Sequence, residues 1–274
     1  MMTKRINQTM GAALLLVGAS LSGVAWASTW TWDFTGGDIL AANDTQGVVT
    51  ATASAVSSSS NITALAGAGA SLKYNGSSGL SVIGGGESAS TTSPNHATDN
   101  EGYLEAILFN FSGAKVNLDV ANFGWVGRQN TNSPYDSDYS VYAFMGNEAL
   151  FTTALSYKAM QSADISVNKG WKLVGHYSGG TTVNTPGNPT GGNRSITGSD
   201  YSSHWLIGAY NGLGSGVDGS GSVIDSTKDY FKLRTLTGST FERQVPEPGT
   251  LLLMGAGLLG LTRLNTRRMV RSAA

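Results

Sequence analysis

Short segments in which apolar and polar residues alternate recur along the chain between residues 28 and 245. In TWTWDF the alternation places Trp30, Trp32 and Phe34 on one face, because successive side chains of a strand point to opposite sides. A period of two predicts strands rather than helices. Further strands are predicted at residues 103–111, 115–120, 139–144, 171–177, 204–210 and 229–236, with weaker candidates at 47–55 and 80–83.

Clusters of Gly, Ser, Asn and Pro separate these segments, as in GGTTVNTPGNPTGGN at residues 179–193. Many short strands divided by turns predict an all-β body, an antiparallel β-sandwich of the jelly-roll type, over residues 28–237. Within it, only residues 147–162 have a pattern compatible with a helix. The Ala-, Ser-, Thr- and Gly-rich stretch at 50–93 is expected to be mostly loop at the rim, and residues 238–245 a linker.

The strand at 103–111 carries a carboxylate among large apolar residues. Glu105 shares a face with Tyr103, Ile107, Phe109 and Phe111, while Leu104, Ala106 and Leu108 occupy the other. Two apolar faces indicate a strand in the middle of a sheet, with Glu105 facing the core. A buried carboxylate needs a partner, and Arg128, His96 or a metal ion could supply it. The alternative is that Glu105 faces solvent and the Leu104 face points inward.

Oxygen-bearing side chains gather just before this strand. Asp99, Asn100 and Glu101, together with Glu105, are the calcium candidates, since calcium takes six to eight oxygen ligands. The alternative is a network of Asx turns that orders the loop without metal. Asp136 and Asp138 could chelate a cation or form a solvated turn after Pro134, and Asp218 and Asp225 are open to the same two interpretations.

The first 27 residues have the pattern of a secretory signal peptide. Lys4 and Arg5 form a basic start, an apolar run follows from 11 to 24, and Ala25 and Ala27 place small residues before the expected cleavage point. The body is therefore expected to be exported by the general secretion machinery.

The last 29 residues combine a turn, an apolar run and a basic end. Pro246, Glu247 and Pro248 precede a Leu- and Gly-rich run at 251–261, which is short for a membrane-spanning helix of about 20 residues. The expected cytoplasmic tail after it carries Arg263, Arg267, Arg268 and Arg271.

Composition narrows the possible functions. Six of the 17 basic residues lie at the two ends, so the segment between them holds 11 basic against 18 acidic residues, a net charge of −7. That balance argues against nucleic acid as a partner. Cysteine is absent, which excludes disulfides and thiolate chemistry. Only 13% of residues are charged and 37 are glycine, a composition that suits an exported β protein.

The ending Pro246-Glu247-Pro248, with its apolar run and terminal arginines, resembles the PEP-CTERM sorting signal over residues 246–274. The resemblance implies processing by an exosortase, a membrane-embedded transpeptidase-like enzyme, with the tail as a transient membrane anchor. Arg263 interrupts the apolar run early, which is a departure from the pattern.

The body resembles a family of exosortase-dependent surface proteins, through PNHATDNEGYLEAILFNFSGAKVNLDVANFGW, DSDYSVYAF, WLIGAY and DYFKL between residues 94 and 233. That family implies a surface protein of Gram-negative bacteria that produce exopolysaccharide, with no known catalytic activity.

We therefore expect a non-enzymatic protein of the cell surface, outer envelope or extracellular matrix, associated with exopolysaccharide. One alternative is a calcium-stabilised carbohydrate-binding module, in which exposed tryptophans such as Trp125 and Trp171 stack on sugars. A glycan hydrolase is the remote alternative, because the sequence shows many carboxylates but no motif that selects a catalytic pair.

Overall fold

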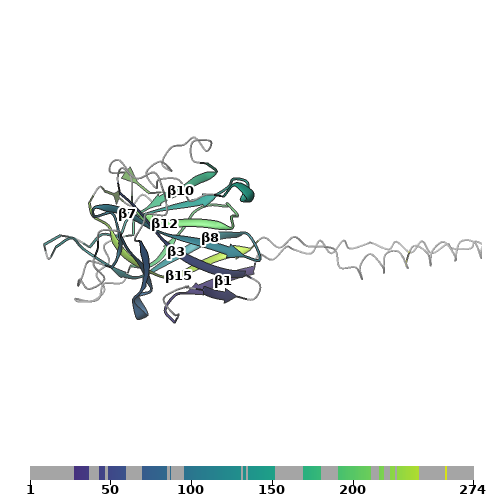
Figure 1. Ribbon diagram of the computed structural model, residues 1–274, viewed down its shortest axis with the longest axis horizontal. Coiled ribbons are helices and arrows are strands. Elements are labelled where there is room, and N and C mark those ends of the chain that lie inside the picture. Colours follow the sequence, from purple (N-terminus) through teal and green to yellow (C-terminus); the bar gives the residue numbers. More distant parts are fainter. Residues whose placement is uncertain are drawn as a thin grey trace, which may run out of the picture. The chain divides into compact units, whose positions relative to one another are not determined.

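The computed structural model describes residues 28–36, 43–46, 49–59, 70–84, 87, 96–130, 132–133, 135–151, 169–179, 191–210, 216–218, 223–225, 227–240 and 257. Apart from Gly257, these residues belong to one compact unit, Trp26–Glu242. The described part of this unit is all-β, with two antiparallel sheets and only two short 3-10 turns, η1 (Gly76–Ser78) and η2 (Glu148–Leu150) (Figure 1).

The first sheet is built around the long strand β15 (Tyr230–Thr240). On one side β15 pairs with β8 (Val116–Val126), which pairs in turn with β11 (Gly192–Ser195). Its other partners follow one another along its length and are β6 (Thr98–Asp99), β5 (Leu80–Ile83) and β1 (Ser28–Asp33), with β4 (Ser71–Tyr74) beyond β5.

The second sheet has β7 (Tyr103–Ser112) between two neighbours, as the apolar character of both its faces predicts. Its strand order is β10 (Trp171–Tyr177), β9 (Tyr139–Phe144), β12 (His204–Ala209), β7, β3 (Val49–Ser59) and β2 (Asn43–Gln46). A separate two-stranded ribbon pairs β13 (Gly216–Val217) with β14 (Val223–Ile224).

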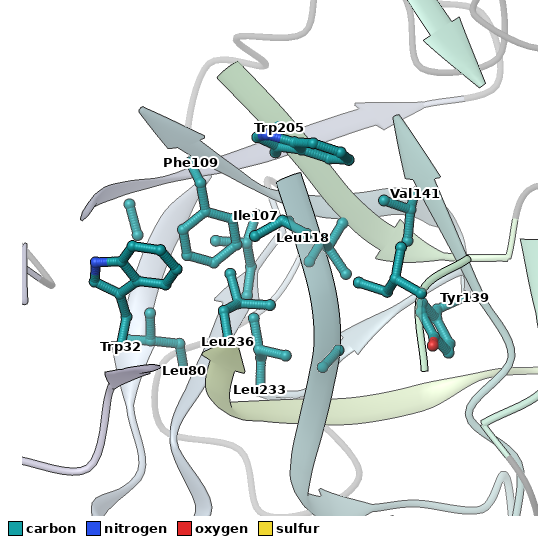
Figure 2. Packing of buried hydrophobic residues seen from close by; sticks show 14 of the residues in the cluster. Trp32, Leu80, Ile107, Phe109, Leu118, Tyr139, Val141, Trp205, Leu233 and Leu236 are labelled. Atoms are coloured by element: carbon teal, nitrogen blue, oxygen red, sulfur yellow. The ribbon is translucent and has the colours of Figure 1, made fainter. Parts of the chain in front are cut away.

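The main hydrophobic core lies between the two sheets. Figure 2 shows Leu80 and Leu233 of the first sheet packed with Ile107 and Phe109 of the second. Trp32 is also fully buried, with its ring 4.8 Å from that of Phe111. A smaller cluster on the opposite face of the second sheet contains Val56, Ala106, Leu108, Tyr142, Phe144, Trp171 and Leu206.

Glu105 lies on the core side of β7, as the sequence predicts. It shares its face with Ile107 and Phe109, which belong to the main core, and it is 1% exposed. Since β5 and β6 of the first sheet lie near the start of β7, the Glu105 carboxylate sits between the two sheets at one end of the core. This position brings it close to acidic residues from the first sheet.

Three segments differ from their predicted organisation. The stretch at 50–93, expected to be mostly loop, contains most of β3 and all of β4 and β5. The weaker strand candidates at 47–55 and 80–83 are confirmed as β3 and β5, whereas β4 was not predicted. Strand β15 continues to Thr240, so residues 238–240 are strand rather than linker. Within 147–162, the structure describes residues up to Phe151 and shows only η2.

Candidate functional site

Three carboxylates from separate elements meet between the sheets. Asp99 comes from β6 of the first sheet, Glu105 from β7 of the second, and Glu87 from the connection after β5. Each contributes one oxygen to a group whose members all lie within 4.8 Å of one another. Asp99 and Glu105 are buried and Glu87 is half-buried. We call these three residues the sheet-bridging carboxylates.

Backbone N–H groups donate hydrogen bonds to all three sheet-bridging carboxylates. The N–H of Gly84 donates to Glu87 Oε2 at 3.2 Å, that of Asp99 to Glu105 Oε2 at 3.2 Å, and that of Glu101 to Asp99 Oδ1 at 2.8 Å. Burial raises the pKa of Asp99 to about 8, with the neighbouring Glu87 and Glu101 adding to the shift. Burial, together with the charges of Asp99 and Glu87, raises the pKa of Glu105 well above its ordinary value.

Two of the four predicted calcium ligands make other contacts. Asn100 Nδ2 donates to Asp229 Oδ2 at 2.7 Å, and Glu101 Oε2 accepts a hydrogen bond from the Tyr230 hydroxyl at 2.6 Å. Asp99 and Glu105 therefore come together as the sequence suggests. Their third partner is Glu87, which lies twelve residues before Asp99 along the chain and which the sequence analysis did not select.

A second acidic group lies where loops enter β9 and β15. Asp136, Asp138 and Asp229 are all buried, and one oxygen from each lies within 4.8 Å of the others. We call these residues the loop aspartates. They fasten several loops together, because Asp138 accepts from the N–H groups of Gly179 at 3.2 Å and Asp225 at 3.0 Å.

The other loop aspartates are equally well supplied with donors. Asp229 accepts from Asp138 N at 2.7 Å and from Asn100 Nδ2, and Asp136 accepts from Ser137 N at 2.9 Å and from the Thr227 hydroxyl. Burial raises the pKa of Asp138 to about 7, and the Asp136 charge adds to that shift. Burial also raises the pKa of Asp136 and, more strongly, that of Asp229.

The two tryptophans predicted to stack on glycans differ in their surroundings. Trp171 is 0% exposed and packs against Phe144, with ring centroids 5.6 Å apart, so a sugar has no access to its face. Trp125 is half-buried, and the Lys232 ammonium lies 4.8 Å from its ring centroid. Trp32 and Trp205 are fully buried.

Apart from Gly257, both terminal signals lie outside the described residues, including Ala25 and Ala27, the Pro246-Glu247-Pro248 turn and the four terminal arginines. Among the residues that the structure does describe, no helix is long and apolar enough to cross a membrane.

Comparison with known proteins adds one finding at the C-terminus. Residues 244–268 match the family model described as the PEP-CTERM protein-sorting motif. No curated protein and no solved structure matches the chain. The chain thus carries a PEP-CTERM sorting motif, which implies an exported protein that an exosortase processes at the membrane and that resides in the cell envelope or at the surface.

Proposed function

We propose that this chain is a non-enzymatic surface or extracellular-matrix protein whose β-sandwich body associates with exopolysaccharide. The observation that carries the proposal is the sorting motif at residues 244–268, which directs the protein to the exosortase pathway. The resemblance of residues 94–233 to exosortase-dependent surface proteins supplies the link to exopolysaccharide. In this proposal the apolar run after Pro248 anchors the chain only until it is processed.

The environment of the acidic residues supports a structural role. A glycosidase needs two carboxylates that reach a sugar from either side of its scissile bond. The carboxylates with raised pKa values in the described part of the chain include Asp99, Glu105 and Asp229, which are at most 2% exposed. Side chains so deeply buried suit the fastening of loops and sheets better than contact with a polymer.

The tryptophans support the same role over that of a carbohydrate-binding module. Sugar-stacking needs an accessible aromatic face, whereas Trp32, Trp171 and Trp205 contribute to the two hydrophobic clusters. Trp125 already has a cation over its ring. Association with exopolysaccharide would then use the neutral Ser-, Thr-, Asn- and Gly-rich surface rather than an aromatic platform.

Replacing Pro246, Glu247 and Pro248 together with alanine tests the sorting step. We expect the variant to remain in the inner membrane at its unprocessed mass, as the wild-type chain should in a host without exosortase. Fractionation and intact-mass measurement of the two strains make the comparison. Normal processing of the variant in the exosortase-containing host would contradict the proposal.

Association with exopolysaccharide is tested by fractionating cells that cannot synthesise the polymer. The processed protein should shift from the matrix fraction to the medium, while its signal and tail are still removed normally. Unchanged retention in the matrix would contradict this part of the proposal and leave the sorting step intact.

A further inference from the structure

The sheet-bridging carboxylates lack an adequate positive partner among the described residues. Lys228 is the basic group that lowers the pKa of Asp99, and its Nζ donates to the carbonyl oxygen of Asn100 at 3.3 Å. Arg128, one of the partners expected for Glu105, lies 4.8 Å over the ring of Tyr135. Neither ring nitrogen of His96, the other expected partner, has a hydrogen-bond partner in the described structure. Among the described residues, Lys228 is therefore the basic group near three carboxylates, and it cannot balance their charges.

A buried hydroxyl without a partner points at the same place. Ser57 of β3 is the cross-strand neighbour of Glu105 and is 3% exposed. Its Oγ has no hydrogen-bond partner in the described part of the structure. A buried polar atom without a partner is costly, so an unpaired hydroxyl beside a carboxylate favours a ligand at this position.

Gly84 shows where the two oxygens converge. A Cβ atom on Gly84 would lie 2.2 Å from Glu105 Oε1 and 3.3 Å from Ser57 Oγ. Both atoms therefore point to the space over the Gly84 backbone, whose N–H already donates to Glu87. The absence of a side chain at this position leaves room for the carboxylates to approach one another.

The donor set and its spacing suit a hard divalent cation. Carboxylate and hydroxyl oxygens are the ligands that calcium prefers, at about 2.3–2.6 Å. Two ligands on opposite sides of such an ion lie about 5 Å apart, so carboxylate oxygens within 4.8 Å of one another can all contact one ion. We propose that Glu87, Asp99, Glu105 and the Ser57 hydroxyl bind one calcium ion, with backbone oxygens or water completing its coordination.

Such an ion would tie the two sheets together. Asp99 belongs to the first sheet, Ser57 and Glu105 belong to the second, and Glu87 belongs to the connection that follows β5. The chain has no cysteine, so no disulfide can form this link. Extracellular calcium modules work at dissociation constants of about 0.1–1 mM, which matches the compartment that the sorting motif implies. The inference itself does not rest on the proposed function.

Calcium titration of the full chain, purified in detergent and freed of metal with EGTA, tests the site. Calorimetry should show one bound calcium ion per chain, and the midpoint of thermal unfolding should rise with calcium. Glu105→Gln and Glu87→Gln keep the side-chain size but remove a charge, and each should weaken calcium binding at least about tenfold. Asp200→Asn is the matched control, because Asp200 pairs with Lys172 away from these residues and its loss should leave calcium affinity unchanged.

Ser57→Ala separates a ligand from a structural residue. The hydroxyl has no hydrogen-bond partner in the described structure. Its removal should therefore leave the midpoint temperature of unfolding in EGTA unchanged or slightly higher. Its calcium affinity should nevertheless fall several-fold. This variant and Glu87→Gln, whose side chain is half-buried, decide the matter even if Glu105→Gln does not fold.

Three results would overturn the inference. The first is the absence of binding heat and of a shift in unfolding temperature up to about 10 mM calcium, well above the range of extracellular modules. The second is unchanged affinity in both Glu87→Gln and Ser57→Ala. The third is an equal response to magnesium, which would indicate general charge screening rather than a calcium site.

Discussion

The sheet-bridging carboxylates and the loop aspartates are neighbouring groups of three carboxylates, and they differ in how their negative charges are stabilised. Asp99 belongs to the first group, and the next residue, Asn100, donates to Asp229 of the second. Both groups place three acidic oxygens within 4.8 Å of one another. In the loop aspartates, each of the six carboxylate oxygens accepts a hydrogen bond. The sheet-bridging carboxylates have fewer donors. Each group has a buried hydroxyl without a partner in the described structure, Ser57 in the first and Ser137 in the second.

This difference teaches that burial and spacing alone do not distinguish a metal site from a hydrogen-bonded network. Buried carboxylates are stabilised by donors, by retained protons or by a cation. The loop aspartates have enough N–H and O–H donors to order their loops, with retained protons reducing the repulsion. The smaller number of donors, and the convergence of Glu105 Oε1 and the Ser57 hydroxyl on the Gly84 backbone, make the sheet-bridging group the one that fits a cation.

The largest expected effect follows from removing a loop aspartate. Asp229→Ala leaves the buried Asp138 N–H without its acceptor and removes one acceptor of the Asn100 amide, which keeps the Tyr210 carbonyl at 3.0 Å. An unpaired buried donor costs about 1–3 kcal/mol, so we expect the free energy of unfolding, measured with urea in EGTA, to fall by about 2–3 kcal/mol. Asp229→Asn keeps one acceptor oxygen and should cost less.

The comparison also requires calcium to stabilise Asp229→Ala as much as it stabilises the wild type. A loss below about 1 kcal/mol would show that these donors are not essential to the fold. Loss of the calcium response with stable folding would mean that the two groups form one site.

A combined pH and calcium series gives the next effect. The folded-state pKa of Asp99 is about 8 against an ordinary 3.8, so between these values the fold keeps a proton that the unfolded chain has released. Its stabilising contribution is complete below about pH 4 and is lost as the pH rises to about 8, at up to about 1.4 kcal/mol per pH unit. The pKa of Asp138 is about 7, so its contribution to the free energy of unfolding is also lost as the pH rises.

Calcium should offset only the Asp99 and Glu105 part of this loss, because it replaces the protons on those carboxylates. At 100 times its dissociation constant, calcium adds about 2.7 kcal/mol to the free energy of unfolding. We expect the calcium-induced rise in unfolding temperature to be larger at pH 8 than at pH 5. If the calcium-induced rise were independent of pH, calcium would not be binding to the carboxylates that titrate.

The smallest predicted effect comes from adding a methyl group. A Cβ at residue 84 displaces the end of the Glu105 side chain, so Gly84→Ala should weaken calcium binding by about tenfold. In EGTA the variant should lose no more than about 1 kcal/mol, since a flexible carboxylate can move aside. Gly36→Ala is the matched control, because its Cβ would contact nothing. Equal calcium affinities in the two variants would show that Gly84 does not border the calcium site.

Much of the fold could be predicted from local alternation. Strands β9 and β10 match their predicted bounds, and β7 has the predicted central position with Glu105 facing the core. The edge strands β2, β4 and β11 were missed, because four residues are too few to show a clear alternation. Strand β15 runs past Leu236 because Thr237 to Thr240 pair with both β1 and β8.

The candidate site was only half predictable, since it depends on contacts between distant segments. Asp99 and Glu105 stand out because they flank one strand start, whereas Glu87 reaches them only through the pairing of β5 and β6 with β15. Ser57 is opposite Glu105 only because of the register between β3 and β7. Asn100 donates to Asp229, which the sequence presents only as the first residue of a predicted strand. The sorting motif, by contrast, is contiguous and so was predictable.

A crystal structure of the protein grown with calcium, with anomalous diffraction recorded at long wavelength, tests the central claim most directly. The account predicts one anomalous peak contacted by Glu87, Asp99, Glu105 and the Ser57 hydroxyl, and none among Asp136, Asp138 and Asp229. A peak among the loop aspartates, or no peak at the sheet-bridging carboxylates in saturating calcium, would contradict it.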